Sequence, residues 1–168
     1  MISVVIPAFN EEDSIENIIK ELLDVLKKMK LPSYEIILIN DGSTDNTLEI
    51  TKKLNIEVIS NPENIGYGFS LKRGIEKAKF ETVFIIDADQ TYPIEEFPKL
   101  YQEYLKGFDM VIGQRTGSFF IESSLKFFLR RILKFLVEFV ASKKIPDINS
   151  GMRIFNRDTI KVFFPHLS

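Results

Sequence analysis

The sequence of 168 residues lacks several of the residues on which common enzyme mechanisms depend. It contains no cysteine, which excludes disulfides, thiolate zinc sites and cysteine nucleophiles. Its single histidine, His166, leaves little room for a histidine metal cluster or a Ser-His-Asp triad. There is no basic excess either, with 22 Lys and Arg against 24 Asp and Glu, so no overall positive field predicts a nucleic-acid partner.

Features of membrane and secreted proteins are also missing. The apolar run from Met1 to Phe9 is short, has no basic leader and continues into polar residues, unlike a signal peptide or a membrane span. The composition, 45% apolar and 27% charged, is that of an ordinary globular protein. We therefore expect a cytoplasmic chain that forms one well-filled domain over residues 1–168.

Glycine-rich nucleotide motifs are absent as well. Residues 64–68 resemble a dinucleotide-binding loop, but Leu71 stands where the third glycine is required. The loop also follows the third predicted strand instead of the first, and no Walker loop is present. These absences argue against a Rossmann dehydrogenase, and we interpret the glycines as permitting a tight turn and close packing at a helix start.

What the sequence does contain is an alternation of strands and helices. Apolar runs rich in β-branched residues alternate with segments of helical period, which is typical of βαβ units and a parallel sheet. Strands are predicted at residues 2–6, 35–39, 56–59, 82–86, 110–112 and 151–155. Helices are predicted from Asp13 or Ser14 to Leu26, from the Ser43–Asp45 cap to Lys53, and at 66–79, 93–106, 119–141 and 158–164.

Polar residues follow four of the predicted strands. Ligands of open parallel sheets bind beyond the carboxyl ends of the strands, so these residues are candidates for one shared crevice. They are Asn10 and Glu11, Asn40 to Ser43, Asp87 to Gln90, and Gly113 to Arg115.

Asp87 and Asp89 form the most specific of these groups. Two carboxylates one residue apart, at the end of a buried strand, can share a hard divalent cation such as Mg²⁺ or Mn²⁺. Such a cation can neutralise a diphosphate leaving group. A capped turn is the alternative, because aspartate is common where strands stop.

Six sequence strings together carry a family resemblance: VVIPAFNEE, LINDGSTDNT, NIGYGFSLKRG, FIIDADQTYP, MVIGQR and DINSGMRIFNR. In this order and spacing the chain resembles glycosyltransferase family 2, and more closely the polyprenyl-phosphate sugar transferases of the dolichyl-phosphate mannose synthase type. The resemblance implies a GT-A fold, α/β with a Rossmann-like, mostly parallel sheet flanked by helices and an amphipathic acceptor-side helix. It also implies a nucleotide-sugar-binding part at 1–115 and an acceptor and membrane-facing part at 116–168.

The same resemblance assigns roles to individual residues. Nucleotide and donor binding falls on Pro7, Phe9, Glu11, Ile39, Asp41, Asp87, Ala88, Asp89 and Gln90. Close relatives often place the glutamine one position further on, where this chain has Thr91. The metal, Mg²⁺ or Mn²⁺, falls on Asp87 and Asp89. Catalytic or acceptor-side positions are Asp89, Arg115, Asp147 and Arg153, with Ser150 and Gly151 in the same signature.

The residues around Ser150 favour a phosphate acceptor over a hydroxyl. A hydroxyl needs a general base, and residues 149–153, where many family members carry an acidic motif, contain no Glu-Asp pair. A phosphate monoester is already anionic and needs cations to hold it, for which arginine is well suited. The candidates are Arg115, Arg130, Arg131 and Arg153. Asp147 remains an alternative base.

Residues 119–144 mix bulky apolar residues with six basic and two acidic ones. This composition fits a helix lying in a membrane surface, and a core helix with a solvated basic face is the alternative. Our hypothesis is an inverting, metal-dependent hexose transfer from a UDP- or GDP-linked sugar to dolichyl or undecaprenyl phosphate, by a cytoplasmic protein peripherally associated with the membrane.

Two alternatives stay open. One is a family 2 transferase that acts on a saccharide hydroxyl, and the other is a non-catalytic module that binds nucleotide sugar or membranes. The second arises because relatives of this type continue past the position of Ser168, which leaves a C-terminal truncation, a minimal enzyme and an incomplete enzyme all open.

Overall fold

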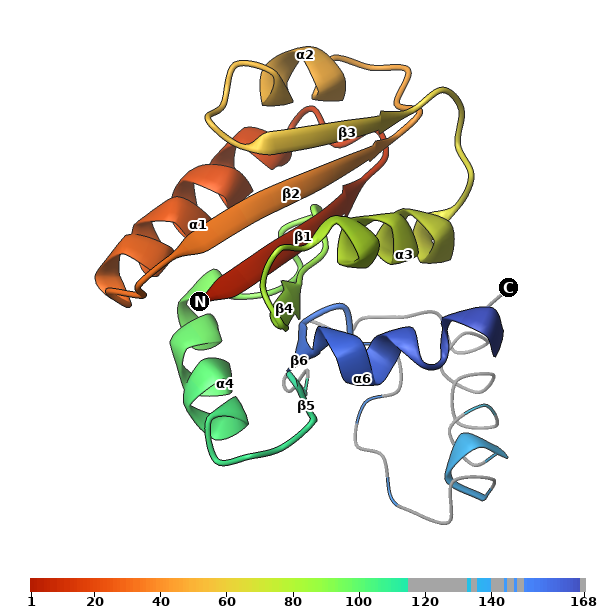
Figure 1. Ribbon diagram of the computed structural model, residues 1–168. Helices are drawn as coiled ribbons and strands as arrows, with labels where there is room; N and C mark the ends of the chain where they lie inside the picture. Colours follow the sequence, from red (N-terminus) through yellow and green to blue (C-terminus); the bar gives the residue numbers. More distant parts are fainter. Residues whose placement is uncertain (115–132, 134–135, 140–143, 145–146, 148–149, 167–168) are drawn as a thin grey trace, which may run out of the picture. The chain divides into compact units, whose positions relative to one another are not determined.

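A computed structural model describes residues 1–114, 133, 136–139, 144, 147 and 150–166 (Figure 1). The chain forms two compact units, one made of residues 1–111 and 151–168 and the other of residues 112–150. Residues 151–168 thus lie in the same compact unit as residues 1–111. Among the described residues, no helix is both long enough and apolar enough to cross a membrane.

The first unit is built around a six-stranded sheet with the strand order β3-β2-β1-β4-β6-β5 (Figure 1). The strands are β1 (Ile2–Ala8), β2 (Tyr34–Asp41), β3 (Glu57–Asn61), β4 (Thr82–Ile85), β5 (Met110–Ile112) and β6 (Arg153–Asn156). β1 pairs in parallel with β2 and β4, and β2 pairs in parallel with β3. β6 is antiparallel to β4. The predicted α/β class and the mostly parallel sheet are confirmed.

The helices follow the predicted alternation. They are α1 (Ile15–Lys28), α2 (Thr47–Thr51), α3 (Tyr67–Lys77), α4 (Phe97–Tyr104) and α6 (Arg157–Lys161), with 3₁₀ turns at Ile94–Glu96 and Phe164–His166. The predicted helix 119–141 lies largely outside the described residues. Of that segment, residues 133 and 136–139 are described, and these are helical.

The core lies on both faces of the sheet because β1 is buried along its whole length. Successive side chains of a strand point to opposite faces, so Val4 joins one apolar cluster with α1, and Val5 joins the other with Ile75 of α3. A β-carbon at Gly74 would collide with Val5. The missing side chain thus lets α3 lie directly on β1, which fixes the start of α3 near the strand ends.

Candidate functional site

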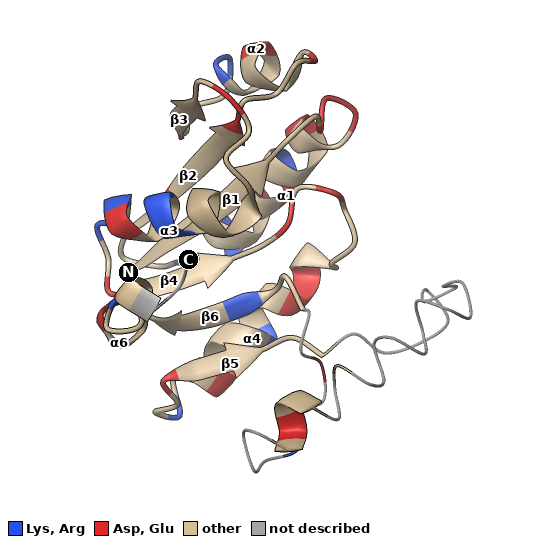
Figure 2. Cartoon of the chain, turned by 90° about the vertical axis from the view of Figure 1, so that its right-hand side faces the viewer, with Lys and Arg blue, Asp and Glu red and all other residues tan. Residues whose placement is uncertain are grey.

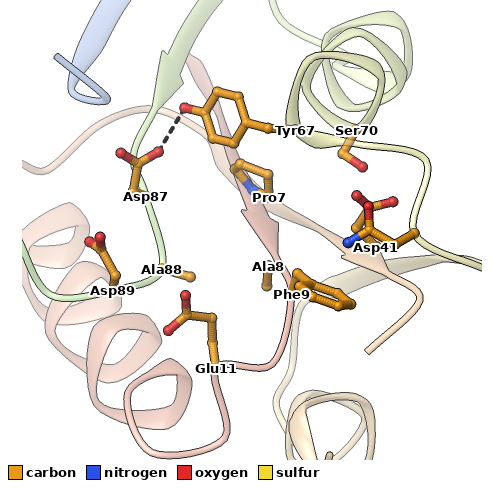
Figure 3. Close-up of a pocket in the computed structure, with 11 residues that line it drawn as sticks. Pro7, Ala8, Phe9, Glu11, Asp41, Tyr67, Ser70, Asp87, Ala88 and Asp89 are labelled. Atoms are coloured by element: carbon orange, nitrogen blue, oxygen red, sulfur yellow. Dashed lines mark hydrogen bonds between the residues drawn. The ribbon is translucent and has the colours of Figure 1, made fainter. Parts of the chain in front are cut away.

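A pocket of about 390 Å³ lies at the carboxyl ends of β1, β2 and β4, where an open parallel sheet is expected to bind its ligand (Figure 3). It is lined by Pro7, Ala8, Phe9, Glu11, Asp41, Asn64, Tyr67, Ser70, Asp87, Ala88 and Asp89. All of these residues belong to the first compact unit. The pocket therefore brings together all but two of the residues that the sequence assigned to donor binding.

The two exceptions are Ile39 and Gln90, which are not among the lining residues. Ile39 is fully buried and packs with Val5 and Ile75 in the core, because its place in β2 turns its side chain toward α3. Gln90 is exposed, has a left-handed backbone (φ 58°) and donates from Nε2 to the Ser14 carbonyl at 3.4 Å. The structure thus gives both side chains protein contacts instead of a place on the pocket wall.

Three carboxylates gather at one end of the pocket (Figure 3). Asp87 follows β4 and accepts a hydrogen bond at Oδ1 from the Tyr67 hydroxyl at 2.7 Å. Asp89 is exposed, and its Oδ1 accepts from the Thr91 amide at 3.0 Å and hydroxyl at 2.6 Å. Glu11 extends toward them from the loop after β1. Figure 2 shows further acidic stretches, in red, on the loops beyond the ends of these strands.

The negative charges at this end act on one another. The pKa of Glu11 is raised, first because burial disfavours its charged form and then because the charges of Asp89, Asp45 and Asp87 lie nearby. A hydrogen bond from Ser14 offsets part of this effect. The carboxylate end therefore carries negative charge that a cation would stabilise.

Asp41 lies at the other end of the pocket, where its carboxylate is buried and hydrogen-bonded to the chain. It is 3% exposed, and its carboxylate accepts hydrogen bonds from the amides of Ile65 (3.0 Å) and Gly66 (2.9 Å) and from Asn61 Nδ2 (2.7 Å). Burial alone would raise the pKa of Asp41, but these hydrogen bonds outweigh it and lower the pKa. The carboxylate holds the loop before α3 in place.

The loops after β1 and β2 are tied to each other beside the pocket. The Thr44 amide donates to Asn10 Oδ1 at 2.8 Å, and the Asn46 amide donates to Glu12 Oε2 at 3.0 Å. In return, the Glu11 amide donates to the Thr47 hydroxyl at 2.8 Å. These reciprocal bonds fix the backbone that presents Phe9 and Glu11 to the pocket.

The donor atoms at the carboxylate end fit a hard divalent cation. Asp87 and Asp89 offer oxygen ligands on the same pocket wall, and the charges of both act on the nearby Glu11. Within the described part of the chain, no three acidic or histidine side chains are grouped to enclose a metal by themselves. The arrangement therefore suits an ion that takes its other ligands from water and from a phosphate-bearing molecule, as Mg²⁺ commonly does.

The predicted catalytic residues fall in different parts of the chain. Arg153 begins β6 opposite Ile85, close to where β4 ends, and its positive charge acts on the phenol of Tyr67. Asp147 lies in the second compact unit and is half-buried. Arg115, Arg130 and Arg131 are outside the described residues.

Sequence reasoning missed the contribution of α3 to the pocket. Tyr67, Ser70 and the preceding Asn64 line it, and desolvation together with the hydrogen bond to Asp87 raises the pKa of Tyr67. The third strand also ends at this edge of the sheet, so the polar residues that follow it carried the same signal as those after the other strands. The glycines around Tyr67 predicted a tight turn and close packing at a helix start, and did not indicate a contribution to the pocket.

A mostly parallel sheet with an acid-lined pocket at its strand ends defines a nucleotide-binding α/β protein of the GT-A type. The family model for glycosyl transferase family 2 matches residues 3–164, and the chain belongs to this family.

Two curated relatives match almost the whole chain. The chain is 30% identical to a dolichyl-phosphate beta-glucosyltransferase of Dictyostelium discoideum, covering 99% of this chain and 57% of that protein. It is also 30% identical to an undecaprenyl-phosphate 4-deoxy-4-formamido-L-arabinose transferase of Pseudomonas fluorescens, covering 95% and 48%. The chain thus spans about half the length of the curated relatives it matches.

A solved structure shares the fold. It is a glucosyl-3-phosphoglycerate synthase from Mycobacterium tuberculosis in complex with Mn²⁺ and UDP-glucose. The two chains are 26% identical, with a TM-score of 0.72 over 94% of this chain and 56% of that one.

Proposed function

We propose that this protein transfers a hexose from a nucleoside diphosphate sugar to a polyprenyl phosphate, with inversion and with the help of a divalent metal. The observation that carries the proposal is a single pocket with a carboxylate end, at Asp87 and Asp89, and a second end lined by Phe9 and Asp41. A nucleoside diphosphate sugar has the matching chemistry, because it joins a base and ribose to a diphosphate that needs a cation.

The carboxylate end would bind the diphosphate. Asp87 and Asp89 would hold Mg²⁺ or Mn²⁺, and the metal when bound supplies positive charge that stabilises the leaving diphosphate. The Mn²⁺ and UDP-glucose in the similar synthase support this assignment. Glu11 adds negative charge behind the two aspartates and so strengthens their attraction for a cation.

The other end would bind the nucleotide. Phe9 is exposed on the pocket wall and offers an aromatic face, while Pro7 and Ala8 provide apolar contact. Asp41 remains a candidate contact for the base, although its carboxylate already accepts three hydrogen bonds from the chain. Such a residue can accept a further bond without moving, because each carboxylate oxygen has two lone pairs.

The acceptor we propose is a lipid phosphate. Its anionic oxygen can attack without a general base, so the chain's task is to hold it in line. Arg153 would contribute to this from the start of β6, together with Arg115, Arg130 and Arg131. The two relatives named for dolichyl and undecaprenyl phosphate support this acceptor class. The basic, apolar segment 119–144 would bring the protein to the membrane surface at the cytoplasmic face.

A two-stage experiment tests the proposal. First, the melting temperature is measured with UDP-glucose and GDP-mannose, each with and without Mn²⁺. A ligand that binds only the folded state raises it, and we expect a rise for one nucleotide sugar that depends on the metal. Second, the stabilising sugar is offered with polyprenyl phosphate beside free saccharides.

We expect glycosyl lipid as the product of the second stage. Transfer to the saccharides would favour the hydroxyl-acceptor alternative. Metal-dependent binding without turnover would indicate a non-catalytic module. Absence of any nucleotide-dependent stabilisation would contradict the assignment of the pocket itself.

A further inference from the structure

We propose that Gly151 and Tyr67 are positioning residues that hold the two oxygens of the Asp87 carboxylate. The inference rests on the proposed function, in which Asp87 is a metal ligand. It assigns Gly151, which the sequence pattern grouped with the acceptor signature, to the donor end of the pocket.

The hydroxyl of Tyr67 fixes one carboxylate oxygen. Tyr67 is the first residue of α3, and its side chain points across the pocket to donate to Asp87 Oδ1 at 2.7 Å (Figure 3). The residue is 51% exposed, so its ring is not held there by burial in the core. Its anchor is the helix, because Gly74 lets α3 lie directly on β1.

The backbone of Gly151 lies close to the other oxygen, Oδ2. In the antiparallel register, Ile85 of β4 lies opposite Arg153 of β6. Extending this register by two residues places Gly151 opposite Asp87, and directly opposed residues in an antiparallel pair direct their side chains to the same face. A β-carbon built at Gly151 would collide with the carboxylate of Asp87, nearest to Oδ2. Only glycine leaves the carboxylate its place.

The backbone at Gly151 is itself held. Its amide donates to the Tyr92 hydroxyl at 2.5 Å, and Tyr92 is 6% exposed. Tyr92 and Asp87 belong to the same loop after β4. Tyr92 of this loop therefore holds the backbone at Gly151 by a hydrogen bond, and the carboxylate of Asp87 lies close against the same backbone. The hydrogen bond opposes a shift of Gly151 that would make room for a side chain.

A carboxylate fixed in this way is prepared to bind a metal. Residues that orient a metal ligand through hydrogen bonds and contacts commonly change metal affinity by about 10- to 100-fold when they are replaced. Arg153, two residues after Gly151, is the first residue of β6. The pairing of β4 with β6 therefore links the proposed metal ligand Asp87 to a proposed acceptor-binding arginine.

Two variants test the proposal, each with a matched control. Tyr67→Phe removes only the hydroxyl, and Gly151→Ala adds only a methyl group. Tyr104→Phe on α4 and Gly68→Ala, where a β-carbon would meet no atom within 4 Å, are the controls. For all four we would measure the Kd of Mn²⁺ in the presence of UDP, the melting temperature, and the metal-free crystal structure.

We expect Mn²⁺ to bind about tenfold more weakly or worse in both test variants and within about twofold of wild type in both controls. The metal-free structures should show the Asp87 carboxylate displaced in both test variants. An unmoved carboxylate with unchanged Mn²⁺ affinity would overturn the proposal. If Gly151→Ala does not fold, Tyr67→Phe decides alone, because Tyr67 is half exposed and the change leaves its ring in place.

The metal-free structures separate this inference from the proposed function. If the wild-type protein binds neither Mn²⁺ nor UDP, the proposed function is wrong. The carboxylate position in Tyr67→Phe and Gly151→Ala still shows whether these residues hold Asp87.

Discussion

The two ends of the pocket contain carboxylates whose pKa values are shifted in opposite directions. Asp41 is buried and accepts three hydrogen bonds from Asn61, Ile65 and Gly66, which lower its pKa. Glu11 lies among other acids at the far end, and burial and their charges raise its pKa. Backbone and side-chain donors of the loop surround the first charge, whereas Glu11, Asp87 and Asp89 place several negative charges near one another. We infer that the first end supports the structure and the second carries the chemistry.

The largest effect should come from the carboxylate end. Asp89→Ala removes a proposed metal ligand, and because a catalytic metal supplies several kcal/mol of charge stabilisation, we expect sugar transfer to fall by about 100-fold or more. Asp89 is exposed, so the free energy of unfolding should change by no more than about 0.5 kcal/mol. Turnover assays and urea unfolding check both values.

Asp13→Ala is the matched control for this substitution, because Asp13 is another exposed aspartate outside the pocket. It should leave transfer and stability unchanged. Full activity in Asp89→Ala would remove the proposed metal site.

The opposite pattern is expected at Asp41. Asp41→Asn replaces one of the two carboxylate oxygens by an amide nitrogen, so at least one half-buried donor loses its acceptor. We expect the free energy of unfolding to fall by about 2 kcal/mol, within the range for hydrogen bonds to charged groups. Urea unfolding of the ligand-free protein measures it. An unchanged stability would mean that Asp41 does not hold the loop.

The smallest effect is expected for Glu11→Gln, which should stabilise the protein where Asp41→Asn destabilises it. Because the folded-state pKa of Glu11 is raised, the folded protein loses stability as the pH rises from the unfolded value of about 4.3 through the folded pKa. Glu11→Gln removes this loss, so the ligand-free variant should melt slightly above wild type at pH 7 and show no gain near pH 3. A lower melting temperature at pH 7 would break the contrast between the two ends.

For Asp41 the sign is reversed. Its folded-state pKa is lowered, so its contribution to stability is present above the unfolded value of about 3.9 and is lost as the pH falls through the folded pKa. Unfolding measured from pH 2 to 7 should therefore show a smaller loss of stability in acid for Asp41→Asn than for wild type, because other carboxylates with a lowered pKa remain in both.

Much of the fold followed from the sequence because its signals are local. Ile2 to Ile6 and Met110 to Ile112 are apolar runs with clear ends, and the structure places β1 and β5 there. The rule that ligands bind beyond the carboxyl ends of parallel strands predicted a shared crevice for Asp87 and Asp89, and both line the pocket. Local periodicity and a topological rule were sufficient for these features.

Other features depend on contacts between distant segments. The core position of Ile39 could not be predicted because β2 is buried on both faces, so an unbroken apolar run does not reveal which side chains face α3. The antiparallel insertion of β6 between β4 and β5 could not be deduced either, and with it the contact between Gly151 and Asp87. The residues that orient the site were therefore harder to predict than the acids themselves.

The most direct test is a crystal structure of the wild-type protein with UDP and Mn²⁺, with data collected at the manganese absorption edge. We predict an anomalous peak coordinated by both Asp87 and Asp89 and by the diphosphate, with uridine beside Phe9. Nucleotide bound in this pocket without a metal at the two aspartates, or a manganese peak elsewhere, would contradict the account.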